Sequence, residues 1–273
     1  AMIDEGLVLV AGRRAKKSYA VSAGDRVSVA GQPGPVDFDA TPDPDLRFDV
    51  LLETVDFVVI DKPVGVPSHP LRAGELGTVA GALVARYPEM RGVGYSRREP
   101  GILHRLDTDT SGVMLAARNA RAFEALREQL RAGQIEKRYL ARCDGMVPAP
   151  DLIDAPIANA PRDKRKVKAC SDPREIKRLG AKAARTEVLT SAPAPHGSLV
   201  ELRANHARRH QIRAHMAWIG HPLLGDALYG GPALRGVGHH LLHALSIRVA
   251  GLDVAATHWK YESFSPELAC SER

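Results

Sequence analysis

The nine residues 104–112 combine the side-chain types that proteins use for acid–base and nucleophilic chemistry. They read His-Arg-Leu-Asp-Thr-Asp-Thr-Ser-Gly and lie between two short apolar runs. This pattern is typical of a polar loop between buried segments, where a chain usually exposes reactive side chains. The alternative is an ordinary turn in which Asp107 or Asp109 caps the backbone and Arg105 is solvated.

The same nine residues indicate how the loop would be held in place. We expect Leu106 to anchor it, while Arg105 and Asp107 face the opposite side if the backbone is extended. Gly112 closes the loop, and a glycine there can adopt a positive φ or let another backbone segment approach closely.

A second dense group of polar residues covers 205–215. Ile212, Met216 and Ile219 follow at helical spacing, and Gly220 is the expected end of that helix. The sequence therefore predicts a short amphipathic helix that carries part of this polar group.

Two pairs within this group bear on its chemistry. Arg209 and Arg213 are four residues apart, so a helix would place both guanidinium groups on one side. His210 and His215 are five apart, whereas two zinc ligands one helical turn apart need a spacing of four. We therefore expect no metal site here.

Apolar periodicity predicts the elements that would position both polar groups. Thr78 and Asn119 are the expected N-caps of two helices. A further strand would place Tyr139, Ala141 and Cys143 on one face. The expected helices cover 79–86 and 119–133, and the expected strands cover 57–60, 134–143 and 199–204.

The chain divides by composition into three parts. Residues 1–30 predict two short strands joined by a basic loop, a piece too small to be stable alone. Residues 31–48 are rich in Gly, Pro and Asp and predict a linker. We expect residues 49–273 to form the main domain. Within it, 162–185 is strongly cationic and has no aromatic residue, which favours a phosphate-contacting segment or a solvated loop.

Charge and cysteine content narrow the setting without deciding the function. The net charge of +6 and pI near 9.3 are compatible with a polyanionic partner. No apolar run approaches the ~20 residues of a membrane span, and the start has no secretory pattern. Three widely spaced cysteines form neither a disulfide framework nor a zinc motif. We therefore expect a cytoplasmic protein that does not bind membranes.

Segment 104–112 resembles the HRLD-x-x-TSG motif of the RluA-type pseudouridine synthases, which modify uridines in ribosomal and transfer RNA. Residues 137–141 resemble the K-x-Y-x-A segment of that family, and 162–185 its cationic loop. Residues 207–226 resemble its G-R-T-H-Q-I-R-x-H and G-H-P-x-x-G-D motifs, with Ala207 in place of the usual Gly and Arg209 in place of Thr or Lys. Residues 1–30 resemble half of an S4-type RNA-binding domain.

The resemblance implies an α+β fold, with a bent, mostly antiparallel mixed sheet and a central RNA-binding cleft, preceded by the truncated S4-like piece. It implies Asp107 as the catalytic carboxylate, Arg213 as its ion-pair partner, and Tyr139 against the target base. Arg105 would fill the gap left by the extruded nucleotide. No cofactor or metal is implied. The expected substrate-binding residues are His104, Arg105, Arg165, Lys166, Arg208, His210, Gln211 and Leu224.

The substrate that we expect is large-subunit (23S) ribosomal RNA, because the S4-like piece is commoner among family members that act on ribosomal RNA. The alternative within the family is a transfer RNA pseudouridine synthase. A non-catalytic RNA-binding protein would have no reason to carry Asp107, Tyr139 and Arg213 together. A glycoside hydrolase using Asp107 and Asp109 would need carboxylates facing each other across a sugar. We expect a monomer with no protein partner.

Overall fold

The computed structural model describes residues 3, 6–16, 18–30, 37–249 and 252–255, and the description below concerns these residues. Backbone contacts divide the chain into two compact units, Ala1–Phe38 and Asp39–Arg273. Within the described residues, no helix has the length and apolar character needed to span a membrane.

The first unit contains a small antiparallel sheet with the strand order β2-β1-β3. The outer two valines of β3 are about half exposed, so this sheet buries little apolar surface. We expected two strands joined by a basic loop, and the structure adds β2 within that loop because Ala11 and Gly12 form a tight turn with positive φ. Lys17 of the expected loop lies outside the described residues. The strands are β1 (Val8–Val10), β2 (Arg13–Arg14) and β3 (Val27–Val29).

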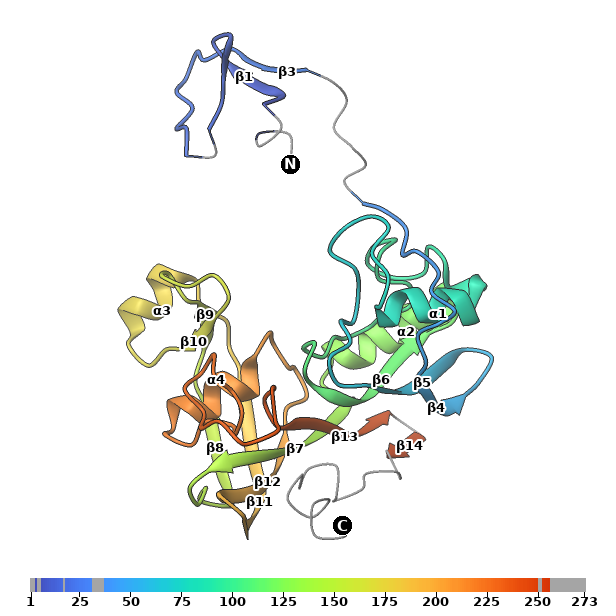
Figure 1. The fold of residues 1–273 in the computed structure, drawn as a ribbon, viewed down its shortest axis with the longest axis vertical. Helices are drawn as coiled ribbons and strands as arrows, with labels where there is room; N and C mark the ends of the chain where they lie inside the picture. Colours follow the sequence, from blue (N-terminus) through green and yellow to red (C-terminus); the bar gives the residue numbers. More distant parts are fainter. Residues whose placement is uncertain (1–2, 4–5, 17, 31–36, 250–251, 256–273) are drawn as a thin grey trace. The chain divides into compact units, whose positions relative to one another are not determined.

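The second unit is organised on a nine-stranded sheet with the order β4-β5-β6-β13-β7-β12-β11-β8, and β14 pairs with β13. Among the described strands of this sheet only β6 and β13 pair in parallel, so the expected mixed, mostly antiparallel α+β fold is confirmed (Figure 1). Its strands are β4 (Asp49–Glu53), β5 (Phe57–Lys62), β6 (Ser111–Ala117), β7 (Glu136–Asp144), β8 (Asp151–Asp154), β11 (Arg185–Ala194), β12 (Gly197–Arg203), β13 (Leu242–Val249) and β14 (Leu252–Ala255).

Helices α1 and α2 begin where the sequence predicts caps. The Thr78 side chain accepts a hydrogen bond from the Gly81 N–H, and the Asn119 side chain accepts one from the Ala122 N–H. Each cap satisfies a backbone donor that the first turn leaves unpaired. In the order of the chain the helices are α1 (Val79–Arg86), the 3-10 turn η1 (Pro88–Met90), α2 (Ala120–Arg131), α3 (Pro173–Leu179) and α4 (Gln211–Trp218).

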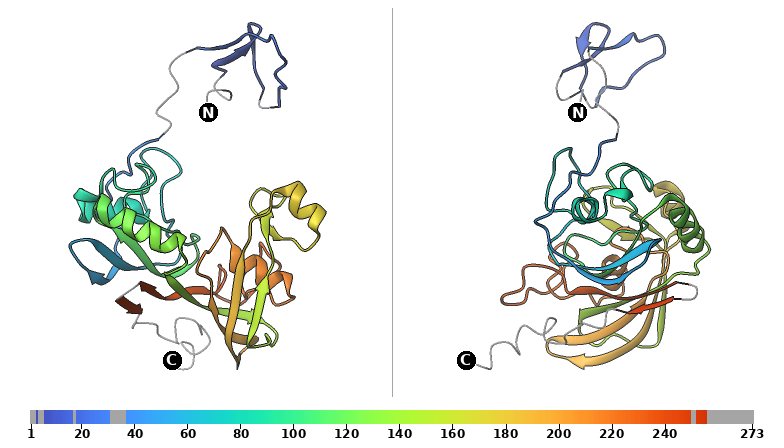
Figure 2. Two further views of the ribbon diagram at one scale, coloured as in Figure 1. Left: turned by 180° about the vertical axis from the view of Figure 1, so that it is seen from behind. Right: turned by 90° about the vertical axis from the view of Figure 1, so that its right-hand side faces the viewer.

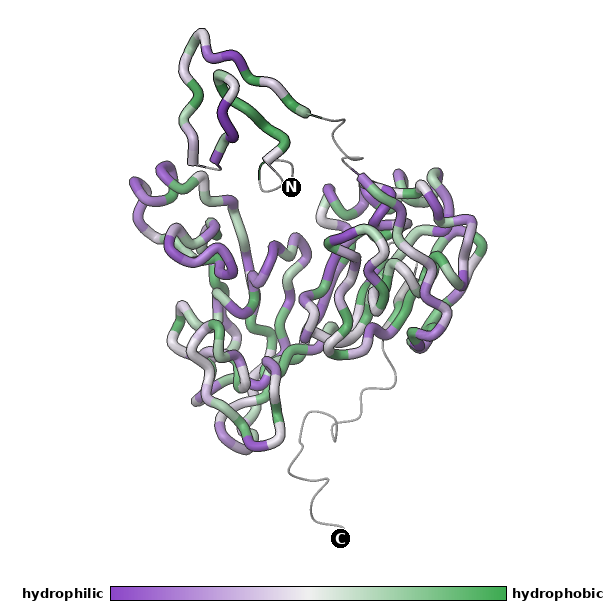
Figure 3. Tube along the Cα trace, turned by 45° about the horizontal axis from the view of Figure 1, so that its top comes forward, coloured by the Kyte–Doolittle hydropathy of each residue, from purple (hydrophilic) through white to green (hydrophobic). Residues whose placement is uncertain are grey.

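The expected cationic loop at 162–185 is partly regular. It contains α3 and β10 (Val167–Ala169), which pairs with β9 (Ile157–Asn159) in a separate two-stranded sheet. Asp172 caps α3, Pro173 is its first residue, and Gly180 ends it in the left-handed conformation. No residue of α3 is buried, and the segment is mostly hydrophilic (Figure 3). The cap, proline and glycine were the signals for this helix in the sequence.

Helices cover both faces of the sheet, because successive side chains of β5 and β6 point to opposite sides. Val58 and Ile60 belong to the apolar cluster that also contains residues of α1 and α4. Val59 belongs to a second cluster with Phe123 and Leu126 of α2. In Figures 1 and 2, α1 and α2 lie at the β5–β6 end of the sheet and α4 lies near β8 and β12.

Residues 39–48, within the expected linker, contain no helix or strand but group with the second unit. Ala40 and Asp43 are buried, and Asp43 accepts a hydrogen bond from the Gly77 N–H at 2.7 Å. A Cβ atom on Gly81 would lie 2.6 Å from the Thr41 carbonyl oxygen, so this stretch packs closely on α1. The division of the chain therefore falls about ten residues before the predicted start of the main domain at residue 49.

Candidate active site

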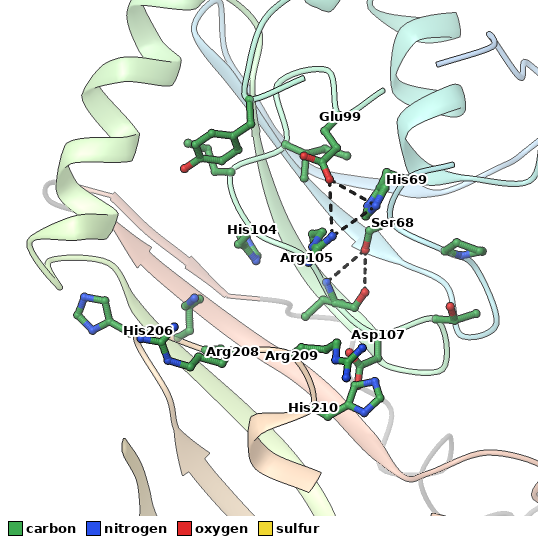
Figure 4. A pocket seen from close by; sticks show the side chains of 18 of the residues that line it. Ser68, His69, Glu99, His104, Arg105, Asp107, His206, Arg208, Arg209 and His210 are labelled. Carbon is green, nitrogen blue, oxygen red and sulfur yellow. Dashed lines mark hydrogen bonds and ion pairs between the residues drawn. The ribbon is translucent and has the colours of Figure 1, made fainter. Parts of the chain in front are cut away.

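A pocket of about 980 Å³ brings the polar loop and the second polar group together (Figure 4). Its lining comes from 67–75, 95–109, the end of α2 and 205–213, together with Lys137 and His240. Six predicted site residues line it: His104, Arg105, Asp107, Arg208, His210 and Arg213.

Ser68 holds the loop that carries Asp107 through two hydrogen bonds. Its Oγ accepts a hydrogen bond from the Leu106 N–H at 3.2 Å and donates one to the Leu106 carbonyl at 2.8 Å. Leu106 is buried, whereas Arg105 is exposed and Asp107 is half-buried. The predicted anchoring of the loop through Leu106 is therefore confirmed.

Lys62, at the end of β5, holds the other side of this loop. Its side chain has no exposed surface, and Nζ donates to the carbonyls of Pro63, Val66 and Thr108 at 2.6–2.9 Å. Burial lowers the pKa of Lys62 to about 8, although nearby Asp109 and Asp107 oppose the shift. Lys62 therefore connects the end of β5 directly to Thr108, the residue after Asp107.

Lys62→Met should lower the free energy of unfolding by about 2–4 kcal/mol, because buried carbonyl groups lose their charged donor. Chemical denaturation measures this. Lys177→Met, which removes an exposed lysine of α3, is the control and should change stability by less than about 0.5 kcal/mol. Equal stability of the Lys62 variant and the parent would contradict this account.

Gly112 at the end of the loop satisfies both conditions predicted for it. Its φ is +108°, and a Cβ atom there would lie 2.2 Å from the carbonyl oxygen of Ala244. Ala244 belongs to β13, which pairs with β6 at this point. A side chain at residue 112 would therefore separate the two parallel strands that support the loop.

Arg213 of α4 lies between two carboxylates. Its Nη1 donates to Asp107 at 3.0 Å, while Nε and Nη2 donate to the two oxygens of Asp226 at 2.7 and 2.8 Å. Burial alone would lower the pKa of Arg213, but the hydrogen bonds and charges of Asp226 and Asp107 outweigh it and raise the pKa. The bidentate pair fixes the guanidinium plane, so that one remaining N–H is directed at Asp107.

His210 lies near the same oxygen of Asp107 as Arg213 does, with Nε2 3.8 Å from Oδ2. Its backbone is left-handed, with φ 53° and ψ 19°, and its Nδ1 lies 3.1 Å from the Tyr229 hydroxyl. Such strained residues are enriched at active sites. Because α4 begins only at Gln211, Arg209 precedes the helix, and the expected shared helical face of Arg209 and Arg213 is wrong.

Tyr139 lies on β7, close enough to Asp107 to interact with its charge. Its side chain is 4% exposed and is not among the described residues that line the pocket. Burial, with the negative charge of Asp107, raises the pKa of Tyr139, so the hydroxyl stays protonated at neutral pH. Tyr139, Ala141 and Cys143 share one apolar cluster, as the alternation predicted.

Residues 56–218, more than half of the chain, match the family model described as RNA pseudouridylate synthase. The chain belongs to the RNA pseudouridylate synthase family. It is 34% identical over 229 residues to an uncharacterised RNA pseudouridine synthase of Bacillus subtilis, YlyB, and 36% identical over 229 residues to ribosomal large subunit pseudouridine synthase D of Xylella fastidiosa. Each match covers 84% of this chain, with 72% and 65% of the respective relative.

The fold agrees with that membership. Human RNA pseudouridylate synthase domain containing 4 has a TM-score of 0.60 and 24% identity, covering 80% of this chain and 92% of that one. At this identity the comparison concerns the fold alone. The predictions of family and fold class are confirmed, and the enzyme class follows from the family: the chain is an RNA-modifying isomerase.

Among the described residues of this synthase, four predicted substrate-binding residues do not line the pocket: Arg165, Lys166, Gln211 and Leu224. Gln211 is buried and its Nε2 donates to Thr186 and to the Arg185 carbonyl, while Leu224 is fully buried among apolar side chains. Both side chains therefore lie in the interior, Gln211 at the start of α4 and Leu224 in a small apolar cluster. Arg165 and Lys166 lie on the cationic segment outside the pocket, and Arg165 pairs with Asp163.

The structure also identifies site residues to which the sequence reasoning gave no role. Asp226 orients Arg213, and it is the last residue of the G-H-P-x-x-G-D motif. Arg209 donates to the carbonyls of Lys164 and Lys166 at 3.1 Å and so connects the cationic segment to the pocket. The motif was the available signal for Asp226, whereas no sequence pattern indicated the contacts of Arg209.

Arg105 has partners that its expected role did not include. Its Nη1 lies 3.6 Å from a carboxylate oxygen of Glu99 and 3.4 Å from Nε2 of His69, and both partners line the pocket (Figure 4). More than half of the Arg105 side chain is exposed. The guanidinium therefore lies at the solvent-facing wall of the pocket, held by a carboxylate that is itself mostly covered.

Proposed function

We propose that this enzyme converts uridines of large-subunit ribosomal RNA to pseudouridine, with Asp107 as the catalytic carboxylate. The observation that supports this most strongly is the placement of Asp107 on the pocket wall, 3.0 Å from a guanidinium fixed by a second, buried carboxylate. An arginine held in this way orients the facing carboxylate through a charge-assisted hydrogen bond.

The reaction itself needs a carboxylate more than any other group. The bond between N1 and C1′ breaks, the uracil turns, and a bond forms between C5 and C1′. The proton on C5 then leaves and N1 gains one, so the product is an isomer. Asp107 has three possible roles: stabilising the electron-deficient sugar, attacking it, or removing a sugar proton.

Arg105 and Tyr139 have supporting roles in this proposal. Arg105, exposed at the pocket wall, would occupy the space left by the extruded nucleotide, since a base inside a helix is out of reach. Tyr139 would lie against the base once the pocket is occupied, and its protonated hydroxyl would move a proton late in the cycle.

Tyr139→Phe should leave RNA affinity nearly unchanged and lower turnover by about 10²-fold, because only the hydroxyl is lost. Single-turnover kinetics measure the chemical step directly. Tyr95→Phe makes the same change on a half-exposed tyrosine of the pocket rim and serves as the control, with an expected effect below about threefold. An unchanged rate for the first variant would give Tyr139 a packing role only.

The substrate class rests on the relatives and on the charge distribution. Two synthases named for the ribosomal large subunit, from Xylella fastidiosa and Xanthomonas campestris, are 36% and 40% identical to this chain. We interpret residues 1–30 as a partial S4-like RNA-binding domain, 31–48 as the linker and 49–273 as the catalytic domain. Backbone contacts from the first part and from 162–185 would add affinity without sequence preference. We further propose a cytoplasmic monomer.

Initial rates on unmodified large-subunit RNA fragments and on unmodified transfer RNA, at matched salt concentration, test the substrate class. The proposal predicts the faster reaction on the ribosomal fragments, since the site would read splayed loop bases of a large folded RNA. A faster reaction on transfer RNA would favour the alternative substrate and leave the enzyme class unchanged.

A further inference from the structure

Lys137 is a buried cation in the pocket that the reaction described above does not use. Its side chain is 4% exposed and forms part of the pocket wall. Burial lowers the pKa of Lys137 to about 8. A buried ammonium group is costly unless it is paired, and no carboxylate within the described parts of the chain pairs with it.

The neighbouring imidazole offers Lys137 no acceptor. His104 Nε2 accepts a hydrogen bond from the Leu115 N–H at 3.1 Å, so the proton of the neutral ring is on Nδ1. Burial and the charge of Lys137 lower the pKa of His104 to about 3, which keeps the ring neutral. Nδ1 of His104 is also buried without a hydrogen-bond partner. Two adjacent donors therefore lack an acceptor, as expected for a site that receives an anionic oxygen.

The surrounding wall has one sign of charge. The described carboxylates that line the pocket all come from 75–109, whereas the lining residues from the end of α2 and from 205–208 include none. Lys137 adjoins the second of these segments, because its backbone N–H donates to Oδ1 of Asn205 at 3.1 Å. Nε of Arg208 donates to the Ala183 carbonyl at 2.7 Å. Figure 4 shows His206 and Arg208 at the end of the pocket away from Asp107 and His210.

The position of Lys137 fixes which part of an RNA would reach it. Lys137 and Tyr139 are two residues apart on β7, so their side chains share a face and are separated by ~7 Å along the strand. A base held at Asp107 and Tyr139 would thus leave the sugar–phosphate chain beside it within reach of Lys137, whereas the base itself would be occupied elsewhere.

We propose that Lys137, supported by Arg208 and His206, binds a backbone phosphate next to the target uridine and so sets the register of the RNA strand in the pocket. This inference rests on the proposed function. The proposed contact differs from those of the exposed cations of 162–185. A buried ammonium group can contact only one phosphate, whereas exposed, flexible side chains can contact successive phosphates as the strand moves.

Lys137→Met tests the contact with a short single-stranded RNA that contains one uridine. Affinity should fall about 10- to 100-fold, and the slope of log Kd against log salt concentration should decrease by about 0.7, the value for one lost phosphate contact. The catalytic rate at saturating RNA should stay within about threefold of the parent, since the contact is made equally in the ground state and the transition state. Arg121→Met removes an exposed cation of α2 and should change neither affinity nor slope.

A neutral methylphosphonate linkage on either side of the uridine identifies the phosphate. One of the two linkages should weaken binding by the parent about as much as Lys137→Met does, and should have no further effect on the variant. Additive losses at both linkages, or unchanged affinity of the variant, would overturn the proposal. A lowered catalytic rate with unchanged affinity would also overturn it and assign Lys137 to the chemistry. If the parent forms no pseudouridine in any RNA, the proposed function fails instead.

The parent protein provides a test that needs no folded variant. Bound phosphate would raise the pKa of Lys137 above about 8, so its contribution to affinity is complete below pH 8 and is lost as the pH rises further. Affinity for the all-phosphate RNA should therefore fall as the pH rises above about 8, and affinity for the RNA with the critical neutral linkage should not. Equal pH profiles for the two RNAs would contradict the proposal.

Discussion

Asp107→Asn is expected to lower turnover by about 10⁴-fold or more while RNA affinity stays within about threefold of the parent. The amide keeps the size and the acceptor oxygen of the carboxylate but has no charge. It can neither attack the sugar, nor stabilise positive charge on it, nor remove a sugar proton, so the chemical step is lost under each of the three roles of Asp107. Single-turnover measurement of pseudouridine formation, with an independent binding assay, separates the two quantities.

Asp109→Asn is the matched control, because Asp109 lies two residues away and lines the same pocket. Its rate should remain within about tenfold of the parent. The pair also tests the hydrolase alternative, in which both carboxylates are required. Residual activity of the Asp107 variant within about tenfold of the parent would contradict its assignment.

The second large effect is expected at Arg213. Arg213→Met removes the partner of Asp107 and leaves Asp226, whose side chain is 1% exposed, as an unpaired buried charge. The free energy of unfolding should fall by about 3–5 kcal/mol. Turnover at a temperature where the variant is folded should fall about 10³-fold, because Asp107 loses its orienting donor.

A double variant separates the two consequences of losing Arg213. Arg213→Met combined with Asp226→Asn removes both charges of the buried pair, so much of the stability should return while turnover stays low. Recovery of activity together with stability would show that Arg213 acts only through the fold. Arg213→Lys should keep part of the stability but little activity, since an ammonium cannot donate to both carboxylates in the same plane.

Local sequence signals predicted the helices and the strands near the site. Thr78 and Asn119 cap the helices that they were expected to cap, and Ile212 and Met216 are buried on the predicted face of α4. These features depend on neighbours within a few residues, which a sequence displays directly. Gly112 was predictable for the same reason, although its contact partner Ala244 was not.

Features that depend on distant segments could not be predicted from the sequence in the same way. Lys62 reaches the carbonyl of Thr108, and Asp226 reaches the guanidinium of Arg213, only after the sheet has formed. Leu224 was expected to touch substrate because it lies in a motif, but the structure buries it completely. A motif shows that a position is constrained, and the fold decides whether the constraint comes from packing or from substrate.

Incubation of the purified protein with RNA tritiated at C5 of uridine tests the central claim most directly. Formation of the bond between C5 and C1′ expels the hydrogen on C5, so each turnover releases one tritium into water. The account predicts release by the parent, in proportion to the pseudouridine formed, and none by the Asp107→Asn variant under the same conditions. No release by the parent on either ribosomal or transfer RNA, or equal release by the variant, would contradict it.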